Sequence, residues 1–195
     1  MPTVKVKGLK GFSEFRAFPT VADTAASYSA SGTPLQFVGA SNCNVSDNRQ
    51  EFSIPGDDGI YDSGSELTGV DVEVTIHEVD LEQLAALTGC TINEVKTAIE
   101  EGSFDIPNMM AIAYRALRRD GGYRCFRYYC AKLISYSVEH KTKGTSTDGQ
   151  PYKLKFKCIP RKVDGFVRGI EDVANAAASV AWLATIPTVT LTATP

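Results

Sequence analysis

The sequence lacks any long apolar run. Its 195 residues are 43% hydrophobic and 22% charged, yet no stretch approaches the roughly 18–20 apolar residues that a membrane-spanning helix requires. The opening residues, MPTVKVKGLKGF, carry basic side chains but no apolar segment of the secretory type. We therefore expect a protein that is made in a cytoplasm and has no membrane partner, with one main domain plus appendages.

Histidine and cysteine are scarce and scattered. The two histidines, His77 and His140, show no metal-ligand spacing, and the five cysteines include no CxxC pair. Cys125 and Cys130 fall in one predicted strand, roughly 17 Å apart at about 3.3 Å per residue. A disulfide requires Cα atoms about 4.4–6.8 Å apart, so we expect these two to be free thiols and predict no metal site.

Catalytic signatures are also missing. The sequence contains no GxSxG, no HExxH and no glycine-rich phosphate loop. Asp57 and Asp58 are adjacent acids that general acid–base catalysis could use, but in a Gly/Pro-rich turn such residues are usually solvated. We expect no enzymatic activity and no cofactor.

The net charge of −3 conceals a strong division of charge along the chain. Residues 40–110 contain fifteen acidic side chains and two basic ones, a net charge of −13, whereas residues 111–170 contain fourteen basic and four acidic ones, a net charge of +10. Salt-bridged neighbouring strands, complementary faces between subunits and a nucleic-acid patch would each explain this division. The last is the weakest explanation, because the basic residues are spread over predicted strands.

The clearest local pattern is an alternation of apolar and polar residues over Val70–Val79, which predicts a half-buried strand. The apolar positions are Val70, Val72, Val74 and Ile76, and the polar ones are Asp71, Glu73, Thr75 and His77. From Asp80 the spacing becomes helical, with Asp80 as the expected N-cap and Gly89 as the expected terminator. The pattern thus predicts a strand that runs directly into a helix near 80–88.

The segment Ser46–Glu66 combines turn-forming pairs such as Pro55-Gly56 with small apolar islands. One interpretation is a disordered surface loop, and the other is a long extended hairpin. We favour a hairpin that docks on a neighbouring subunit, because exposed loops rarely carry several large apolar side chains. The candidate inter-subunit residues are Phe52, Ile54, Asp57, Asp58, Ile60 and Tyr61.

Three further elements complete the predicted core. Thr91–Glu101 is predicted to be a second helix, since Thr91 and Glu94 match a capping box. Met109–Leu117 has a helix-like composition, but Asp120-Gly121 between two apolar runs predicts a hairpin, so we predict a strand. The polar run Lys141–Pro151 is a predicted turn. The next predicted strand, Tyr152–Ile159, carries its lysines outward: Lys153, Lys155 and Lys157.

These elements predict a mainly β (α+β) protein in three parts. Residues 1–33 are expected to form an N-terminal arm and a flexible loop over Thr20–Thr33. Residues 34–162 form a β-sandwich or barrel with one or two short helices and a long hairpin loop. Residues 163–195 form a C-terminal extension in which the sheet has ended and a helix over Glu171–Ala184 is anchored by Trp182.

The acidic face of the Val70–Val79 strand has two possible roles. If the Tyr152–Ile159 strand is its antiparallel neighbour, Asp71 and Glu73 can pair with lysines across the ladder. If it is not, the acids are free to line a lumen or to meet another ring. Both alternatives make this face structural or electrostatic.

The order of elements resembles the major tail protein, or tail tube, family of long-tailed bacteriophages. The stretches that carry the resemblance are GDDGIYDSGSELTGVDVEVTIHEVDLEQLAALTG (Gly56–Gly89), MAIAYRALRRDGGYRCFRYYCAKL (Met110–Leu133) and KTKGTSTDGQPYKLKFKCIPR (Lys141–Arg161). The resemblance covers roughly residues 34–162 and is a pattern of elements rather than an invariant signature.

This resemblance implies a β-sandwich flanked by a helix, assembled into hexameric rings that stack into the tail tube of a virion built in the host cytoplasm. DNA would pass through an acidic lumen without specific binding, and a long loop, here Asp47–Asp62, would reach neighbouring subunits. Tape-measure and tail terminator proteins would be further partners.

Two other functions stay open on the sequence alone. The tube protein of a contractile injection or type VI secretion machine would share the architecture. A monomeric β-sandwich that binds a ligand would instead show a cluster of exposed aromatic side chains, for which the candidates are Tyr123, Tyr128, Tyr129 and Tyr136.

Overall fold

The computed structural model describes residues 8–56, 59–93, 95, 97–140 and 150–191. It is mainly β, as predicted, with 61% of its residues in strands and two short helices. The strands are β1 (Leu9–Asp23), β2 (Ser27–Ala30), β3 (Leu35–Gln36), β4 (Val38–Gly56), β5 (Gly59–Glu78), β6 (Thr91–Ile92), β7 (Ile99–Glu100), β8 (Met109–Arg118), β9 (Tyr123–Val138), β10 (Tyr152–Ile159), β11 (Arg168–Val173) and β12 (Val189–Thr190). The helices are α1 (Leu81–Thr88) and α2 (Ala176–Ala184).

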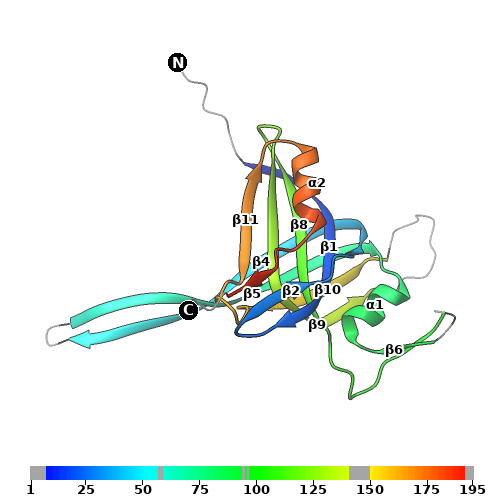
Figure 1. Ribbon diagram of the computed structural model, residues 1–195, viewed down its shortest axis with the longest axis horizontal. Coiled ribbons are helices and arrows are strands. Elements are labelled where there is room, and N and C mark those ends of the chain that lie inside the picture. The colour runs from blue at the N-terminus through cyan, green and yellow to red at the C-terminus, as the bar shows by residue number, and fades with distance from the viewer. Residues whose placement is uncertain (1–7, 57–58, 94, 96, 141–149, 192–195) are drawn as a thin grey trace.

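Ten of these strands form one antiparallel sheet in the order β12-β2-β1-β8-β9-β10-β5-β4 (Figure 1). The remaining two members attach at the side, β11 on β9 and β3 on β1. Because β3 leads directly into β4, the β4 end of the sheet returns to β1. The backbone N–H of Phe37 donates to the carbonyl of Phe15 at 3.2 Å. The sheet therefore curls into an incompletely closed barrel.

Side chains that alternate along the strands fill the interior of this barrel. Val70, Val72, Val74 and Ile76 on β5 are fully buried, as the alternation predicts. The same cluster, here called the barrel core, contains Phe15, Tyr114, Tyr128, Leu133, Leu154 and Phe156 from the neighbouring strands. The inward and outward positions predicted for Tyr152–Ile159 are also confirmed, with Lys153, Lys155 and Lys157 exposed.

A second cluster, the outer core, lies on the other face of β1, β8 and β9, beneath α2 and β2. It contains Phe18, Tyr28, Ala111, Ala113, Tyr129, Cys130 and Leu183. Ala111 and Ala113 therefore serve the outer core while Met110 and Ile112 serve the barrel core. A strand that is buried on both faces has no polar alternation, which is why Met109–Leu117 has a helix-like composition although it is a strand.

The predicted helix near 80–88 is confirmed as α1, which closes one end of the barrel by burying Leu84 and Leu87. Asp80 stands at its N-cap, where the Asp80 N–H donates to Gln83 Oε1 at 3.1 Å, and Gly89 ends it in the left-handed conformation. The connection to β8 is fixed by Asn108, whose Nδ2 donates to the carbonyl of Ala86 at 2.9 Å.

The prediction of a second helix over Thr91–Glu101 is wrong. This segment contains the two-stranded ribbon β6–β7 instead, with Thr91 paired to Glu100 and Ile92 to Ile99. Oδ1 of Asn93 accepts from the backbone N–H groups of Thr97 and Ala98 at 2.7 and 3.0 Å. Asparagine side chains that bond nearby backbone groups favour turns over helices. Glu94, the other half of the expected capping box, lies outside the described residues.

The ends of the chain are more ordered than the sequence predicts. Thr20–Thr33 is not simply a flexible loop, because β1 runs to Asp23 and β2 pairs with it. The sheet also does not end at Pro160–Gly169, since β11 pairs with β9 along six residues. The first residues of the predicted helix Glu171–Ala184 belong to β11, and α2 begins at Ala176.

All five cysteines are free, and Cys125, Cys130 and Cys158 are buried. The predicted turn Lys141–Pro151 lies mostly outside the described residues.

Substitution of Gly89 is expected to destabilise the protein more than the same substitution at Gly121. Both glycines have positive φ, 75° and 90°, and alanine in that region costs about 1–2 kcal/mol. At Gly89 an added Cβ would also clash with the carbonyl oxygen of Ile106, whereas at Gly121 it would meet open space. Urea unfolding of Gly89→Ala and Gly121→Ala tests this; equal losses would contradict the role assigned to the Gly89–Ile106 contact.

Stability is expected to fall as the pH rises above about 8.5. Burial raises the pKa of Cys125 to about 11 and that of Cys130 to about 12, whereas an unfolded thiol has a pKa near 8.5. The unfolded state therefore ionises first, and stability is constant below that pH and lost above it. Urea unfolding between pH 7 and pH 10 measures the decline, which should be shallower in the Cys125→Ala, Cys130→Ala variant.

Candidate functional site

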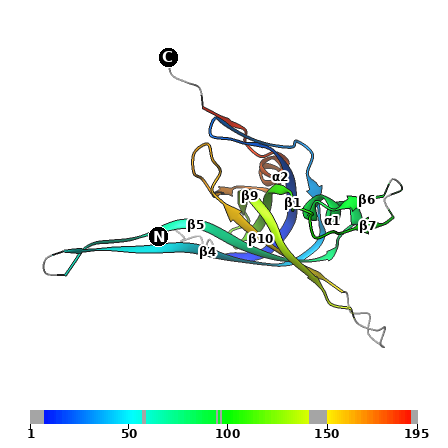
Figure 2. The ribbon, with the colours of Figure 1, turned by 90° about the horizontal axis from the view of Figure 1, so that it is seen from below.

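The most prominent feature is the hairpin of β4 and β5, which projects far beyond the body of the protein (Figures 1 and 2). The two strands pair from Val38 and Glu78 out to Gly56 and Gly59. The extended hairpin is therefore confirmed over the disordered surface loop. We call the part beyond the body, residues 48–69, the arm; at about 3.3 Å per residue its reach is roughly 30 Å.

The arm begins where β10 ends. The last pair between β10 and β5 joins Cys158 to Val70, and Pro160 follows Ile159 without an N–H group to continue the ladder. A Cβ on Gly69 would lie 2.8 Å from the carbonyl oxygen of Cys158, so glycine permits the close approach at this exit. Beyond this point β5 has only β4 as a partner, and the pair leaves the sheet as a ribbon.

The base of the arm is fixed to the body by an ion pair. Arg168, at the start of β11, binds both carboxylate oxygens of Asp47 on β4 at 2.6 and 3.0 Å. The hydrogen bonds that Arg168 donates to the Asp47 carboxylate raise the pKa of Arg168 above its usual value. The bidentate geometry of the Arg168–Asp47 pair fixes an orientation as well as adding energy. Thr68 Oγ1 also donates across the hairpin to the carbonyl of Asn48 at 3.0 Å.

One face of the arm carries the apolar side chains of Phe52 and Ile54. Phe52 lies opposite Gly64 and Ile54 opposite Asp62, whereas Ser53 and Ser63 form a pair on the other face. The Phe52 ring covers Gly64 so closely that a Cβ there would lie 2.7 Å from its Cζ atom. Phe52 and Ile54 remain about half exposed.

Two other predicted residues of the arm, Ile60 and Tyr61, lie near its tip. Tyr61 is 83% exposed. Ile60 pairs through its backbone with Pro55. Asp57 and Asp58 lie outside the described residues. The docking of this arm on a neighbouring subunit stays a prediction.

The second set of predicted residues forms a continuous polar sheet face over β9, β10, β5 and β4. Lys157 stands opposite Asp71 on one side and Lys132 on the other, and Lys155 stands opposite Glu73. Of the two alternatives, the structure therefore shows the one in which β10 is the antiparallel neighbour of β5. The salt bridges that this pairing would allow are not formed, since no ion pair in the described part of the chain joins these acids to these lysines.

This polar sheet face is not acidic. Its charged members are Lys132, Lys153, Lys155, Lys157, Asp71 and Glu73. Lysines thus outnumber acids on this face, although Asp71 and Glu73 belong to the acidic segment of the sequence, residues 40–110. One carboxylate oxygen of Asp71 is buried without a hydrogen-bond partner among the described residues.

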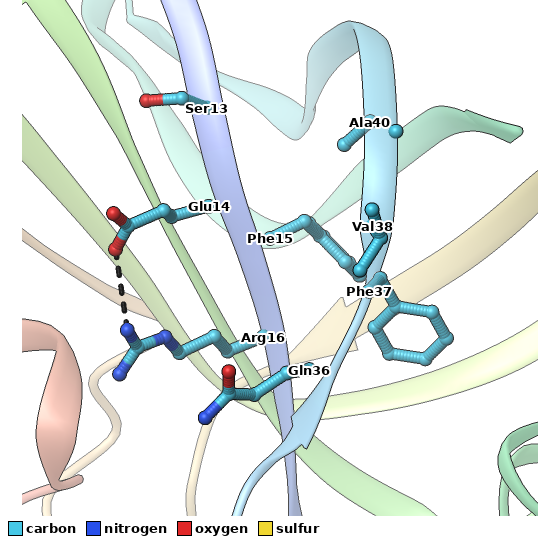
Figure 3. A pocket seen from close by; sticks show the side chains of 9 residues that line it. Ser13, Glu14, Phe15, Arg16, Gln36, Phe37, Val38 and Ala40 are labelled. Carbon is cyan, nitrogen blue, oxygen red and sulfur yellow. Dashed lines mark hydrogen bonds and ion pairs between the residues drawn. The ribbon is translucent and has the colours of Figure 1, made fainter. Parts of the chain in front are cut away.

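A cavity of about 410 Å³ lies at the seam between β1 and the β3–β4 connection, lined by residues 13–16 and 36–40. Figure 3 shows Phe15 and Phe37 on one side of β1 and the side chains of Glu14 and Arg16 on the other. Nη2 of Arg16 lies 3.2 Å from Oε2 of Glu14. The ionisable groups of this lining therefore satisfy each other rather than converging on the cavity.

The aromatic cluster that a ligand-binding module would expose is largely internal. Tyr128 and Tyr129 are buried, and Tyr123 and Tyr136 are half-buried. Tyr136 donates to Glu101 at 2.8 Å. No group of three potential metal ligands occurs among the described residues, and none of their helices has the length and apolarity needed to span a bilayer.

Sequence reasoning missed a set of arginines that hold α2 on the sheet. Arg127 of β9 donates to the carbonyls of Trp182 and Thr185 at 2.6 and 3.1 Å, and its guanidinium lies 3.6 Å from the centre of the Trp182 ring. Arg16 of β1 donates to the carbonyl of Leu183 at 3.2 Å. Trp182 anchors this segment, as predicted. The arginines that bind the segment lie on β1 and β9, far apart in the sequence, so no local pattern predicts them.

Removal of the Asp47 carboxylate is expected to loosen the arm without unfolding the body. Asp47→Ala leaves Arg168 without its partner, and because both side chains are about 28% exposed the loss should be near 1 kcal/mol or less. Hydrogen exchange should become faster at the arm base, with protection in β8 and β9 unchanged. Arg49→Ala, which removes only a 3.6 Å contact to Asp47, is the matched control. Equal effects of the two substitutions would refute the role assigned to the Asp47–Arg168 ion pair.

No protein-family model matches this sequence, and no curated protein shows a significant match to it. The fold and the chemistry of its surfaces therefore carry the functional conclusion.

Proposed function

We propose that this chain is a structural subunit that assembles with copies of itself, through its arm, into stacked hexameric rings that form the tail tube of a long-tailed phage. In this role it has no catalytic activity, and its partners are neighbouring copies, a tape-measure protein and a tail terminator. The virion is its final location. The observation that carries the proposal is the arm, a two-stranded ribbon that reaches beyond the body and leaves Phe52, Ile54 and Tyr61 exposed.

An isolated two-stranded ribbon is only marginally stable in water. Burying Phe52, Ile54 or Tyr61 against another surface contributes about 1.5–3 kcal/mol for each side chain that is fully covered. The long reach places these side chains beyond the rest of the chain, so a second copy supplies the cover. In the proposed assembly the arm of each subunit binds the next subunit and is not exchanged with the same partner, so the contact is heterologous, and heterologous contacts generate rings or filaments.

The charge of the polar sheet face supports a role at an interface more than a role in the lumen. Exposed lysines attract phosphate groups, and four lysines line this face against two acids. A tube that lets DNA pass without binding requires the opposite sign. We therefore assign Lys153, Lys155 and Lys157, with Asp71 and Glu73, to contacts between subunits.

A substitution of the apolar arm residues tests the proposal. The wild-type protein is expected to show rings or tubes by electron microscopy at some combination of concentration and salt. The variant Phe52→Ser, Ile54→Ser, Tyr61→Ser should lose these assemblies and sediment as small species, with an unchanged circular dichroism spectrum and melting temperature. Asp57→Lys with Asp58→Lys is expected to impair stacking in the same way.

The control is Val38→Ser, which removes a similarly exposed apolar side chain from the body end of β4 and should assemble normally. A wild-type chain that stays monomeric under every condition tried would sink the proposal. Assembly of the triple-serine variant at the wild-type concentration would show that the apolar arm residues are not required for assembly.

A further inference from the structure

The two ends of the barrel differ. At one end α1 closes the interior with Leu84 and Leu87. At the other end the arm has left the sheet, and the inner faces of β1, β8 and β9 line a cavity together with Cys43 of β4. The side chains that line this open end, which we call the mouth, are Leu9, Phe12, Cys43, Tyr114, Ala116, Phe126 and Ile170.

The mouth is an apolar hollow with a basic rim. It encloses a cavity of about 280 Å³, and Leu9 and Ile170 at its border are 43% and 51% exposed. Phe12 and Phe126 pack on the two sides of Tyr114, with ring centroids 5.2 and 4.9 Å from it. Lys10 lines the cavity, and Arg119 lies beside it through the bond from its N–H to the Gly8 carbonyl. Neither cation takes part in an ion pair within the described residues.

The segment between α1 and β8, residues 89–108, lies at the opposite end of the molecule from the arm (Figures 1 and 2). It carries two exposed apolar residues, Phe104 at 94% and Ile106 at 72%. Three acidic residues lie close to them in the sequence: Glu100, Glu101 and Asp105. Its position is fixed, because Tyr136 donates to Glu101 and the Asn108 N–H donates to the carbonyl of Leu87 at 3.3 Å.

We propose that the Phe104 ring of one copy inserts into the mouth of a second copy, with Ile106 against Leu9 and Ile170 and with the acidic residues near Lys10 and Arg119. This inference rests on the proposed function and names a second contact beside the arm. The two surfaces agree in both polarity and charge, since an apolar projection with acidic neighbours meets an apolar hollow with a basic rim. The contact buries aromatic surface that neither end covers within its own chain.

The arm is a weaker candidate for the same hollow. Its phenylalanine, Phe52, already rests on Gly64 and cannot enter a cavity without leaving it. Phe104 has no such cover. Because α1 and the mouth terminate opposite ends of the same strands, a contact between Phe104 and the mouth joins barrels end to end in one direction.

Site-specific photo-crosslinking tests the contact directly. Phe104 is replaced by p-benzoylphenylalanine in the full chain, and assemblies are formed from equal amounts of ¹⁴N- and ¹⁵N-labelled protein. Irradiation is expected to give mixed-isotope crosslinks from residue 104 to peptides that contain Phe12, Phe126 or Ile170. The same residue at position 61 reports where the arm docks.

Assemblies that form without a crosslink between residue 104 and the mouth overturn this inference alone. Crosslinks from position 61 to the mouth would assign the hollow to the arm and overturn it as well. A chain that never associates overturns both this contact and the proposed function, so the two failures are distinguishable by electron microscopy of the same samples.

Substitutions give a second, independent readout. Phe104→Ser with Ile106→Ser, and separately Ile170→Glu in the mouth, should each raise the concentration required for assembly at least tenfold. Val21→Ser removes a side chain that is equally exposed, at 72%, and belongs to neither surface, so it should leave that concentration unchanged. Unaltered assembly of both the Phe104 and the Ile170 variants would overturn the contact.

Discussion

The architecture depends on the sharing of one edge of β9 between two strands. The second half of β9, from Cys130 onward, pairs with β10, and its first half, up to Tyr128, pairs with β11. Pro160 ends β10 at the point of exchange. β5 pairs with β10 but not with β11. Beyond Val70 it therefore no longer has β10 as a neighbour and continues outward paired with β4. The arm and the open mouth are two consequences of this exchange, because the strands that leave as the arm are the ones that would have closed the barrel.

Charge is distributed by residue type as well as by segment. Four arginines of the basic half bind other groups of the same chain: Arg124 binds Asp172, Arg161 binds Asp164, Arg168 binds Asp47 and Arg127 binds the C-terminal end of α2. Four lysines of the same half stand exposed on the polar sheet face: Lys132, Lys153, Lys155 and Lys157. Guanidinium groups suit bidentate and stacked sites, whereas ammonium groups stay hydrated. The net charge of +10 in residues 111–170 is therefore only partly available to a partner.

The carbonyls at the end of α2 show what these arginines contribute. No basic residue lies in the last turn of this helix, and its final carbonyl groups have no intrahelical donors. Arg16 and Arg127, from β1 and β9, supply the missing donors. A short helix with weak intrinsic stability is thus fixed on the sheet by charge-assisted hydrogen bonds, each of which is worth about 1.5–3 kcal/mol.

Local patterns predicted the elements whose environment is asymmetric. The alternation at Val70–Val79, the helix that ends at Gly89 and the hairpin at Asp120-Gly121 each carry a signal in adjacent residues. The ribbon at Thr91–Glu101 was predicted as a helix because Thr91 and Glu94 match a capping box, whereas Asn93 in the same segment forms a turn. The strand β11 and the mouth could not be predicted, because which strand occupies the edge of β9 depends on contacts between segments far apart in the sequence.

The arm and the mouth also place limits on assembly. In the proposed assembly the segment at residues 89–108 and the mouth lie at opposite ends of the barrel, so one copy meets a different neighbour at each end. The proposed arm contact is likewise not reciprocal, and both proposed contacts are therefore directional. Directional contacts close into a ring only when their rotation divides a full turn, and otherwise they continue as a helix. If one contact closes the ring and the other repeats along the axis, two surfaces on one small subunit suffice to build a tube of indefinite length.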